Sequence, residues 1–382
     1  MNEKKVMIVT GEASGDMHGA NLIKAMQREV PGISVSGMGG EALLSTGMTP
    51  LYDASKLSVV GISEVFSHLA DIRAAQQILG QHMSKQKPGL LILIDLPDFN
   101  LMLAKKAKKL GIPVFYYISP QVWAWRSSRV KKIKELVDRM AVILPFEKEF
   151  YRQKGMNVDF VGHPLLDEVK SKKTREEFLA ELSVKDNGQK IIGILPGSRK
   201  KEIQSMLQIF IQAAKLIETG IGRTTFLLPV APTLTDAVMT DCGAEDSGLD
   251  LITTRADRYD LMNACDVVIA ASGTVTLELG ILNIPMVVSY RVSPLSYFLG
   301  SRFIKVEYAS LINLIAGKEV VRELLQENAT PGNISLAIID LLKNKEKYLK
   351  MKDELAKVIS KLGDPGASQR AAKLALSVAM WS

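Results

Sequence analysis

Two carboxylates follow an apolar run in the first half of the chain. Asp95 and Asp98 come directly after Leu90–Ile94, whose composition is typical of a buried strand. A carboxylate at such a position loses solvation unless it is paired or takes part in chemistry. Asp98 falls at the start of the next predicted helix, where free amides and the helix dipole favour its ionised form. We therefore expect Asp98 to be a general base, with helix capping as the alternative.

A pattern in the second half is suited to binding a diphosphate and a ribose. Leu195–Arg199 joins a predicted strand to a helix over 202–218, so helix amides and a forked guanidinium can bind phosphate oxygens. Ala271–Glu278 is a similar turn rich in hydroxyl groups, and its carboxylate can accept both ribose hydroxyls. The predicted nucleotide-binding residues are Gly197, Ser198, Arg199, Ser272, Gly273, Thr274, Thr276 and Glu278. Capping by Ser or Thr is the alternative for either turn alone.

The first turn, Gly11–Gly19, is polar and matches neither common phosphate-binding motif. Its two carboxylates argue against a pyrophosphate and favour hydrogen bonds to hydroxyl groups, as in a sugar. The predicted substrate-binding residues are Glu12, Ser14, Asp16 and His18. Helix capping by Ser14 or Asp16 is the alternative. Gly37–Ala42 resembles part of a dinucleotide motif, but no acidic ribose ligand follows it, and we interpret it as a turn.

A loop with two tryptophans follows the predicted strand Val114–Ile118. The alternation of Trp123 and Trp125 exposes aromatic faces that suit a sugar or an acyl chain, and Arg126 is expected to bind a phosphate. The helix that continues carries Arg129, Lys131, Lys132 and Lys134. Such a basic helix is usually a solvated face, and it also suits contact with anionic lipid.

The elements that must position these turns alternate between short apolar runs and helix-length segments, which predicts parallel strands joined by helices. The first set of strands covers 6–10, 33–36, 90–94, 114–118, 140–144 and 158–161, and the second covers 191–195, 225–229, 249–253, 267–271 and 286–289. We expect an α/β protein with two doubly wound, Rossmann-like domains facing a cleft. Because ligands of such sheets bind beyond the carboxyl ends of the strands, the turns described above should carry the chemistry.

The expected boundaries are an N-terminal domain over 1–165, a connector over 166–190 and a C-terminal domain over 191–345. From residue 333 onward the pattern is helical throughout, and 363–366 divides a long charged helix from a last one.

Composition and charge narrow the class of protein. With 382 residues, 47% hydrophobic and 23% charged, the chain has the balance of a soluble protein of two or three domains. Its net charge is +7, and residues 1–165 alone carry 21 basic against 15 acidic residues, which suits a partner with phosphate groups. Only Cys242 and Cys265 are present, without a CxxC motif, which predicts a reducing cytoplasm. No leader, membrane-spanning segment or zinc-binding cluster is expected.

The segments Gly11–Gly19, Ser119–Arg126, Leu195–Arg199 and Ser272–Glu278 occur together and in this order. In this combination the chain resembles, over essentially its full length, the lipid-A-disaccharide synthases, a bacterial family of inverting glycosyltransferases with the two-domain GT-B fold (family 19). The resemblance implies transfer of a sugar from UDP-2,3-diacylglucosamine to 2,3-diacylglucosamine 1-phosphate (lipid X), giving a β-1,6-linked disaccharide 1-phosphate and UDP. It also implies that helices over 346–382 pack back on the N-terminal domain, and that neither a metal nor another cofactor is required.

The resemblance assigns roles to single residues. Asp98 matches the family's proposed general base, and Arg199 matches an arginine associated with UDP binding. Asn313 and Gln326 join the nucleotide site, although Ile312 stands where many relatives have proline. In-line attack requires Asp98 to approach the acceptor 6-hydroxyl while Arg199 stabilises the leaving diphosphate from across the cleft.

Both implied substrates carry acyl chains, so the enzyme must reach a membrane surface. Residues 61–79 place apolar side chains at helical spacing, and we expect Val65 and Phe66 to touch the bilayer, with core packing as the alternative. The expected location is cytoplasmic and peripheral on the inner face of the bacterial inner membrane. Whether the protein is a homodimer stays open.

Two other functions fit parts of this pattern. One is another UDP-sugar enzyme of the same fold, such as a 2-epimerase or a cell-wall glycosyltransferase. The other is a non-catalytic protein that binds nucleic acid or membrane. The carboxylates of Glu12, Asp16 and Asp98 would repel nucleic acid phosphates, so we expect no nucleic acid partner.

Overall fold

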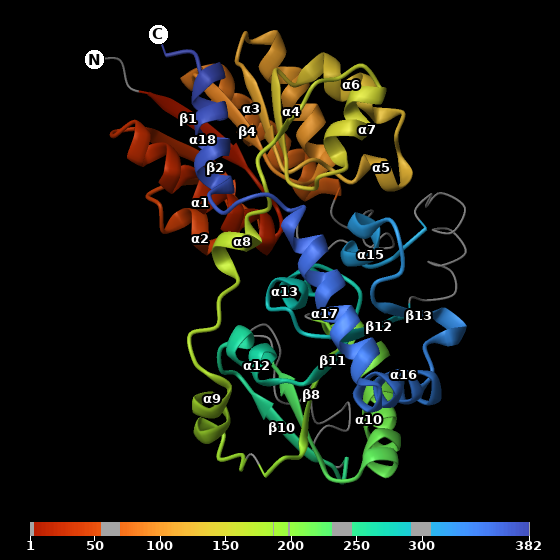
Figure 1. Cartoon of the computed structure of the whole chain (residues 1–382). Coiled ribbons are helices and arrows are strands. Elements are labelled where there is room, and N and C mark those ends of the chain that lie inside the picture. Colours follow the sequence, from red (N-terminus) through yellow and green to blue (C-terminus); the bar gives the residue numbers. More distant parts are fainter. Residues whose placement is uncertain are drawn as a thin grey trace. The chain divides into compact units, whose positions relative to one another are not determined.

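The computed structural model describes residues 4–54, 69–185, 187–197, 199–230, 247–291 and 307–381. The chain divides into two compact units, Met1–Pro164 with Leu362–Ser382, and Leu165–Lys361. Each unit is built around one sheet flanked by helices (Figure 1). The predicted α/β class with two doubly wound sheets is confirmed.

The first unit holds a seven-stranded parallel sheet in the order β3-β2-β1-β4-β5-β6-β7. Val6 of the first strand pairs with Val35 on one side and Leu90 on the other. The strands are β1 (Lys5–Val9), β2 (Ser34–Gly39), β3 (Thr49–Asp53), β4 (Leu90–Leu93), β5 (Val114–Tyr117), β6 (Arg139–Val142) and β7 (Asp159–Phe160). The helices are α1 (Ala13–Glu29), α2 (Glu41–Leu44), α3 (Leu69–Gln86), α4 (Pro97–Lys109), α5 (Val122–Trp125), α6 (Arg129–Leu136), α7 (Glu147–Gln153) and α18 (Ala367–Val378). Strands β4 and β5 are buried at every position, because helices cover both faces of a parallel sheet, and their apolar runs are continuous for this reason.

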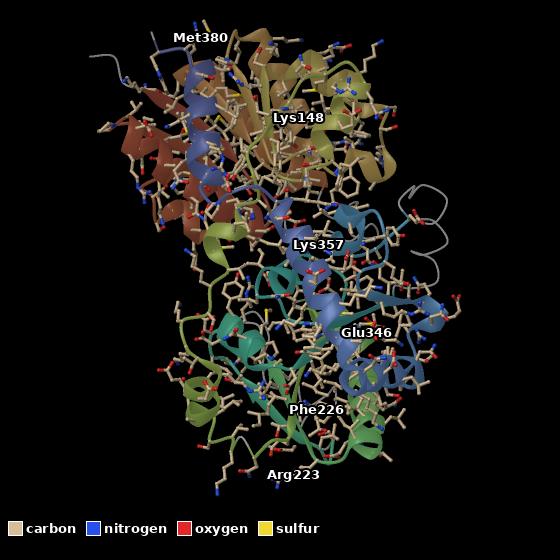
Figure 2. All side chains as sticks on the ribbon, in the orientation of Figure 1. Lys148, Arg223, Phe226, Glu346, Lys357 and Met380 are labelled. Atoms are coloured by element: carbon tan, nitrogen blue, oxygen red, sulfur yellow. The ribbon has the colours of Figure 1, made fainter. Side chains whose placement is uncertain are left out.

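The second unit holds a six-stranded parallel sheet in the order β10-β9-β8-β11-β12-β13. The strands are β8 (Lys190–Leu195), β9 (Thr224–Pro229), β10 (Asp250–Thr254), β11 (Val267–Ala270), β12 (Met286–Tyr290) and β13 (Arg322–Leu325). The helices are α8 (Leu165–Glu168), α9 (Arg175–Glu181), α10 (Lys200–Ile221), α12 (Arg258–Ala264), α13 (Val275–Ile281), α15 (Leu311–Ala316), α16 (Pro331–Lys343) and α17 (Lys345–Ser360), with the 3-10 helix η2 (Gln326–Asn328). Phe226 of β9 is fully buried in the core of this unit (Figure 2).

Two strands of the structure were not predicted, and both lie at a sheet edge. β3 borders the first sheet and β13 borders the second. Every residue of β3 is at least partly exposed, and only Leu324 of β13 is buried. Edge strands need no continuous apolar run, because one side of the ladder and part of each face meet solvent, so the hydrophobic pattern used for prediction is weak there.

The interpretation of Gly37–Ala42 as a turn is only partly right. Gly37, Met38 and Gly39 continue strand β2, and the chain turns at Gly40 before α2. Gly37 has a φ of 156°, and a Cβ atom there would lie 1.8 Å from the carbonyl oxygen of Ile8 in the neighbouring strand. Glycine is therefore required by the close approach of two strands.

The two C-terminal helices belong to different units, unlike the expectation that both return to the N-terminal domain. Helix α17 packs against α13, α15 and α16, and Tyr348 Oη donates a hydrogen bond to the Asp266 carbonyl of the second unit at 2.9 Å. On its solvent side Lys357 forms ion pairs with Asp353 and Glu354 (Figure 2). Helix α18 packs against α1 of the first unit. The boundary falls at residues 361 and 362, where α17 has ended, because the buried side chains of α17 face the second core.

The predicted membrane-contact residues Val65 and Phe66 lie outside the described residues. The part of their apolar stripe that continues into α3 is in the core: Leu79 is fully buried, and Ile72 packs against the same cluster. Among the described helices, none is long and apolar enough to span a membrane.

Candidate active site

The turn after β4 holds both predicted carboxylates in an unusual backbone conformation. Asp95 and Leu96 have φ values of 52° and 41°, in the left-handed region that costs energy for residues with a Cβ. The Asp95 carbonyl accepts hydrogen bonds from Asn100 Nδ2 and Tyr116 Oη, each at 2.6 Å. These bonds hold the strained turn and set where α4 begins.

Asp98 lies in the first turn of α4 with its side chain 72% exposed. Its carboxylate accepts a hydrogen bond from Arg129 Nη2 at 2.5 Å and lies 3.5 Å from Arg126 Nη1. Leu96, not Asp98, is the N-cap residue, and no side chain caps this helix. The capping alternative for Asp98 is therefore wrong. Arg126, which we predicted to bind a phosphate, lies beside this carboxylate.

The polar residues of the turn after β1 differ in their exposure. Glu12 and Ser14 are exposed at the start of α1, whereas Asp16 is buried. Asp16 accepts hydrogen bonds from three amides at the start of α2, those of Gly40 at 2.6 Å, Ala42 at 2.9 Å and Leu43 at 3.3 Å. Asp16 thus caps a helix other than the one that contains it. The prediction that it binds a sugar is not supported, because both of its oxygens are engaged.

Four titratable side chains near this turn influence one another. Burial raises the pKa of Asp95 to about 6, helped by the charge of Glu12 and opposed by that of His18. Burial, together with His18, lowers the pKa of His163 to about 3. His18 and His163 are both buried. Our site prediction from sequence included neither Asp95 nor His163, and their burial, which perturbs both pKa values, depends on the folded structure.

The tryptophan loop forms the short helix α5. Trp123 is half-buried, and its Nε1 donates a hydrogen bond to Glu147 Oε1 at 3.1 Å. Its ring meets that of Phe146 edge to face, with 5.0 Å between the centroids. The backbone of Trp125 belongs to the same helix, and its side chain lies outside the described residues. The loop therefore holds one aromatic ring in a fixed orientation, through a carboxylate that the sequence patterns did not indicate.

In the second unit, the predicted phosphate turn already contains a carboxylate. Arg199 is the N-cap residue of α10, and Glu202 folds back over the helix start. Glu202 Oε2 accepts from the Arg199 amide at 3.3 Å, and its Oε1 lies 3.2 Å from Arg199 Nη1. Gly197 has a φ of 117°, and a Cβ atom there would lie 2.5 Å from Glu202 Oε2. Ser198 lies outside the described residues. A phosphate at this turn would compete with Glu202 for Arg199.

The turn before α13 uses most of its hydroxyl groups internally. Ser272 Oγ donates to the Ala309 carbonyl, and Thr276 Oγ1 donates to the Gly273 carbonyl, each at 2.9 Å. Thr276 is fully buried, so its hydroxyl does not support the predicted contact with a nucleotide. Thr274 is the N-cap residue but makes no side-chain capping bond, and Gly273 has a φ of 156°. The capping alternative is thus wrong for Thr274, and this turn is stabilised by the other hydroxyl groups.

Glu278, the predicted ribose ligand, is buried one turn into α13 and paired across to α12. Its Oε1 lies 2.7 Å from Arg258 Nη2 and 3.5 Å from Tyr259 Oη. Burial raises the pKa of Glu278, whereas the charge of Arg258 lowers it. No hydrogen bond is recorded for Oε2 within the described part of the chain, so this pairing is compatible with a ribose contact.

Asn313 and Gln326 are the last two residues predicted to bind the nucleotide. Asn313 is fully buried: its Oδ1 accepts from the Val320 and Val321 amides, and its Nδ2 donates to the Val321 carbonyl and to Glu323. All of its side-chain hydrogen-bonding capacity is used, so Asn313 belongs to the scaffold and the prediction that it binds nucleotide is not supported. Ile312 beside it is fully buried within α15. Gln326 follows β13 with a φ of 52°, another strained residue at a strand end.

Within the described ranges, no group of three or more His, Cys, Asp or Glu side chains could hold a metal ion. The candidate site residues form two groups. One unit holds Asp98, Trp123 and the carboxylate-rich first turn, and the other holds Arg199 at the start of α10 and Glu278 in α13.

Comparison with known proteins identifies this arrangement. A model of the lipid-A-disaccharide synthetase family matches residues 6–378. The lipid-A-disaccharide synthase of Syntrophus aciditrophicus is 46% identical over 380 residues, covering 99% of this chain and 98% of that protein. The enzyme of the same name from Geobacter metallireducens is 44% identical over 375 residues, with 98% and 97% covered.

The fold is also similar to that of UDP-GlcNAc 2-epimerase from Neisseria meningitidis, solved bound to UDP-GlcNAc. The TM-score is 0.63 over 98% of both chains, with 12% identity, so this likeness concerns the fold alone. The family model and the relatives extend over nearly the whole chain, and the protein therefore belongs to the lipid-A-disaccharide synthase family and is a glycosyltransferase.

Proposed function

We propose that this glycosyltransferase joins UDP-2,3-diacylglucosamine to 2,3-diacylglucosamine 1-phosphate with inversion at the anomeric carbon. The acceptor 6-hydroxyl oxygen attacks that carbon and forms the β-1,6 bond, while the bond to the diphosphate breaks and UDP leaves with the electron pair. The hydroxyl proton passes to a carboxylate. The observation that carries the proposal, beyond family membership, is the exposed carboxylate of Asp98 at the start of α4, held by Arg129.

Asp98 suits the role of base through its position rather than through burial. Its side chain is 72% exposed, so an acceptor hydroxyl can approach it. Arg129, whose side chain is 19% exposed, fixes one carboxylate oxygen. The arginine partner orients the carboxylate, and correct placement at the acceptor hydroxyl is a large part of what a general base contributes.

The second unit supplies the proposed nucleotide site. Arg199 offers a planar fork for two phosphate oxygens, and the dipole at the start of α10 adds to the attraction. Glu278, half of whose carboxylate is engaged by Arg258, is placed to accept from a ribose hydroxyl. These groups stabilise the negative charge that develops on the leaving diphosphate.

The acyl chains of both substrates require contact with a membrane surface, which we place on the first unit. A hollow of about 440 Å³ lies between α4 and α6 and is lined by Lys105, Ser128, Lys131, Lys132, Glu135 and Leu136. Met102, one helical turn before Lys105, is 48% exposed. Lysines beside an exposed apolar side chain suit the headgroup region of an anionic bilayer. Binding at the cytoplasmic face of the inner membrane would follow.

The decisive experiment is to incubate the purified protein with both lipid substrates and to identify the products by mass. We expect the disaccharide 1-phosphate and UDP in equal amounts, with no loss of activity in EDTA. A reaction without the acceptor is the control: conversion of the UDP-sugar alone would indicate an epimerase or hydrolase and would contradict the proposal. Loss of activity in EDTA that Mg²⁺ or Mn²⁺ restores would contradict the metal-free mechanism.

A further inference from the structure

A buried carboxylate lies behind the tryptophan loop and has no part in the reaction described above. Glu147 is the first residue of α7 and is 1% exposed. An ionised side chain at such depth is costly unless several donors compensate it. Its contacts therefore indicate what it stabilises.

The two oxygens of Glu147 have separate partners. Oε2 accepts hydrogen bonds from the amides of Ile143 and Leu144, at 3.2 and 2.9 Å, in the turn that follows β6. Oε1 accepts from Trp123 Nε1 at 3.1 Å, in the helix that follows β5. One carboxylate thus connects the ends of two neighbouring strands.

The surroundings of this carboxylate restrict the indole further. Phe146, the residue before Glu147, packs against the Trp123 ring at an interplanar angle of 86°. Ser119 Oγ and Tyr151 Oη form a hydrogen bond of 2.6 Å next to Glu147. The indole therefore has a fixed donor contact on its nitrogen and an aromatic neighbour, while the ring remains half-buried.

We propose that Glu147 is a positioning residue that orients the Trp123 indole for contact with the acylated glucosamine. This inference rests on the proposed function, because it takes the tryptophan loop as part of the substrate site. Ring orientation matters in such a contact, because an aromatic face stacks on a sugar or an acyl chain only when it is presented flat to it.

The chemistry of the contact explains why a carboxylate is present. Three N–H donors, one indole and two amides, point at this side chain, and only a group with acceptors on both ends satisfies all of them. Glutamine has the same shape but carries an NH₂ group at one end, which would meet either the indole N–H or the amides, donor against donor. Burial raises the pKa of Glu147 to about 7, while these donors lower it, so the side chain is ionised, with acceptors at both ends, above about that pH.

The first test uses fluorescence and needs no catalytic activity. In a protein whose Trp125 and Trp381 are replaced by Phe, Trp123 is the single emitter. We expect Glu147→Gln to shift its emission and to increase acrylamide quenching about twofold or more, because the indole loses its acceptor. Identical emission and quenching in the two proteins would overturn the proposal, whatever reaction the enzyme catalyses.

The second test is a double-mutant cycle in steady-state kinetics. We expect Glu147→Gln to raise KM for the lipid acceptor about tenfold, the size of one lost hydrogen bond, with a smaller change in kcat and unchanged UDP affinity. In a Trp123→Phe background the same substitution should have no further effect on KM. An equal KM change in both backgrounds would show that Glu147 acts on the scaffold instead.

If Glu147→Gln fails to fold, Trp123→Phe still tests the idea, because it removes the donor and leaves the carboxylate in place. We then expect the acceptor KM to rise with UDP affinity unchanged, and an unchanged KM would overturn the proposal. If no transfer reaction is observed in the wild-type protein, the proposed function fails, while the fluorescence test still decides the role of Glu147.

Discussion

The acidic side chains at the carboxyl ends of the two sheets differ in whether they have an arginine partner. In the first unit, Asp95 and Glu147 have no lysine or arginine ion-pair partner within the described part of the chain, and burial raises their pKa values to about 6 and about 7. In the second unit, Glu202 pairs with Arg199 and Glu278 pairs with Arg258. Among the described residues at this edge of the first unit, only Asp98 has arginine partners, and it is largely exposed.

This difference fits what each edge is proposed to bind. A buried carboxylate without a cation nearby holds its proton at higher pH and can then both donate and accept hydrogen bonds, which suits an edge where hydroxyl groups are recognised. An arginine with a carboxylate partner is already oriented, and it can exchange that partner for a phosphate. The two sheets share a topology, and the side chains after their strands distinguish the proposed sugar site from the proposed nucleotide site.

The largest effect is expected from removing the base. Asp98→Asn keeps the size of the side chain but cannot accept the proton, and turnover should fall between about 100-fold and 10,000-fold with UDP affinity intact. Steady-state kinetics and calorimetry with UDP measure the two quantities. Near-normal turnover would remove Asp98 from the mechanism, and Asp138→Asn, a carboxylate of the same unit outside the site, is the matched control.

A pH-dependent effect on stability is expected from Glu147. Burial raises its pKa to about 7 in the folded protein, against 4.5 for a glutamate in water. Between these values the folded protein retains a proton that the unfolded chain has released, so the free energy of unfolding falls as pH rises, by about 3 kcal/mol in total. Urea unfolding measured from pH 4.5 to pH 8 should show this fall in the free energy of unfolding in the wild type and not in Glu147→Gln. Parallel pH curves for the two proteins would contradict it.

A smaller effect is expected at the phosphate turn. Arg199→Lys keeps the charge but loses the planar fork, and UDP affinity should fall about tenfold. Calorimetry decides the outcome, and equal affinity in both proteins would mean that Arg199 acts elsewhere. Arg223→Lys, at an exposed position of the same unit (Figure 2), is the control.

The smallest effect tests whether Glu202 competes with the nucleotide. Glu202→Gln removes the counter-ion of Arg199, and UDP affinity should rise up to about fivefold, because a partly exposed ion pair is worth less than about 1 kcal/mol. The gain should disappear in the Arg199→Lys background, where the fork is lost. A fall in affinity in Glu202→Gln would instead assign this carboxylate to holding the nucleotide turn.

The sequence by itself determined the class of fold and the turns in which we place the chemistry. Continuous apolar runs identified the buried central strands, because strands covered on both faces need no polar positions. The turns around Asp98, Arg199 and Glu278 could be located because a functional side chain at a strand end lies next to the pattern that predicts the strand. The edge strands β3 and β13 lack that pattern and became visible only in the sheets.

Only the tertiary structure decided which polar residues of these turns are free for a ligand. Asp16 and Asn313 have the residue types of a binding site, yet their oxygens are used by amides of other segments, 24 or more residues away for Asp16. In the sequence, Glu147 is an ordinary residue at the start of a helix. Its proposed role arises from its burial and from its hydrogen bond to an indole 24 residues earlier in the chain. Hydrogen-bond partners and desolvation depend on which segments meet in space, and neither is a property of the local sequence.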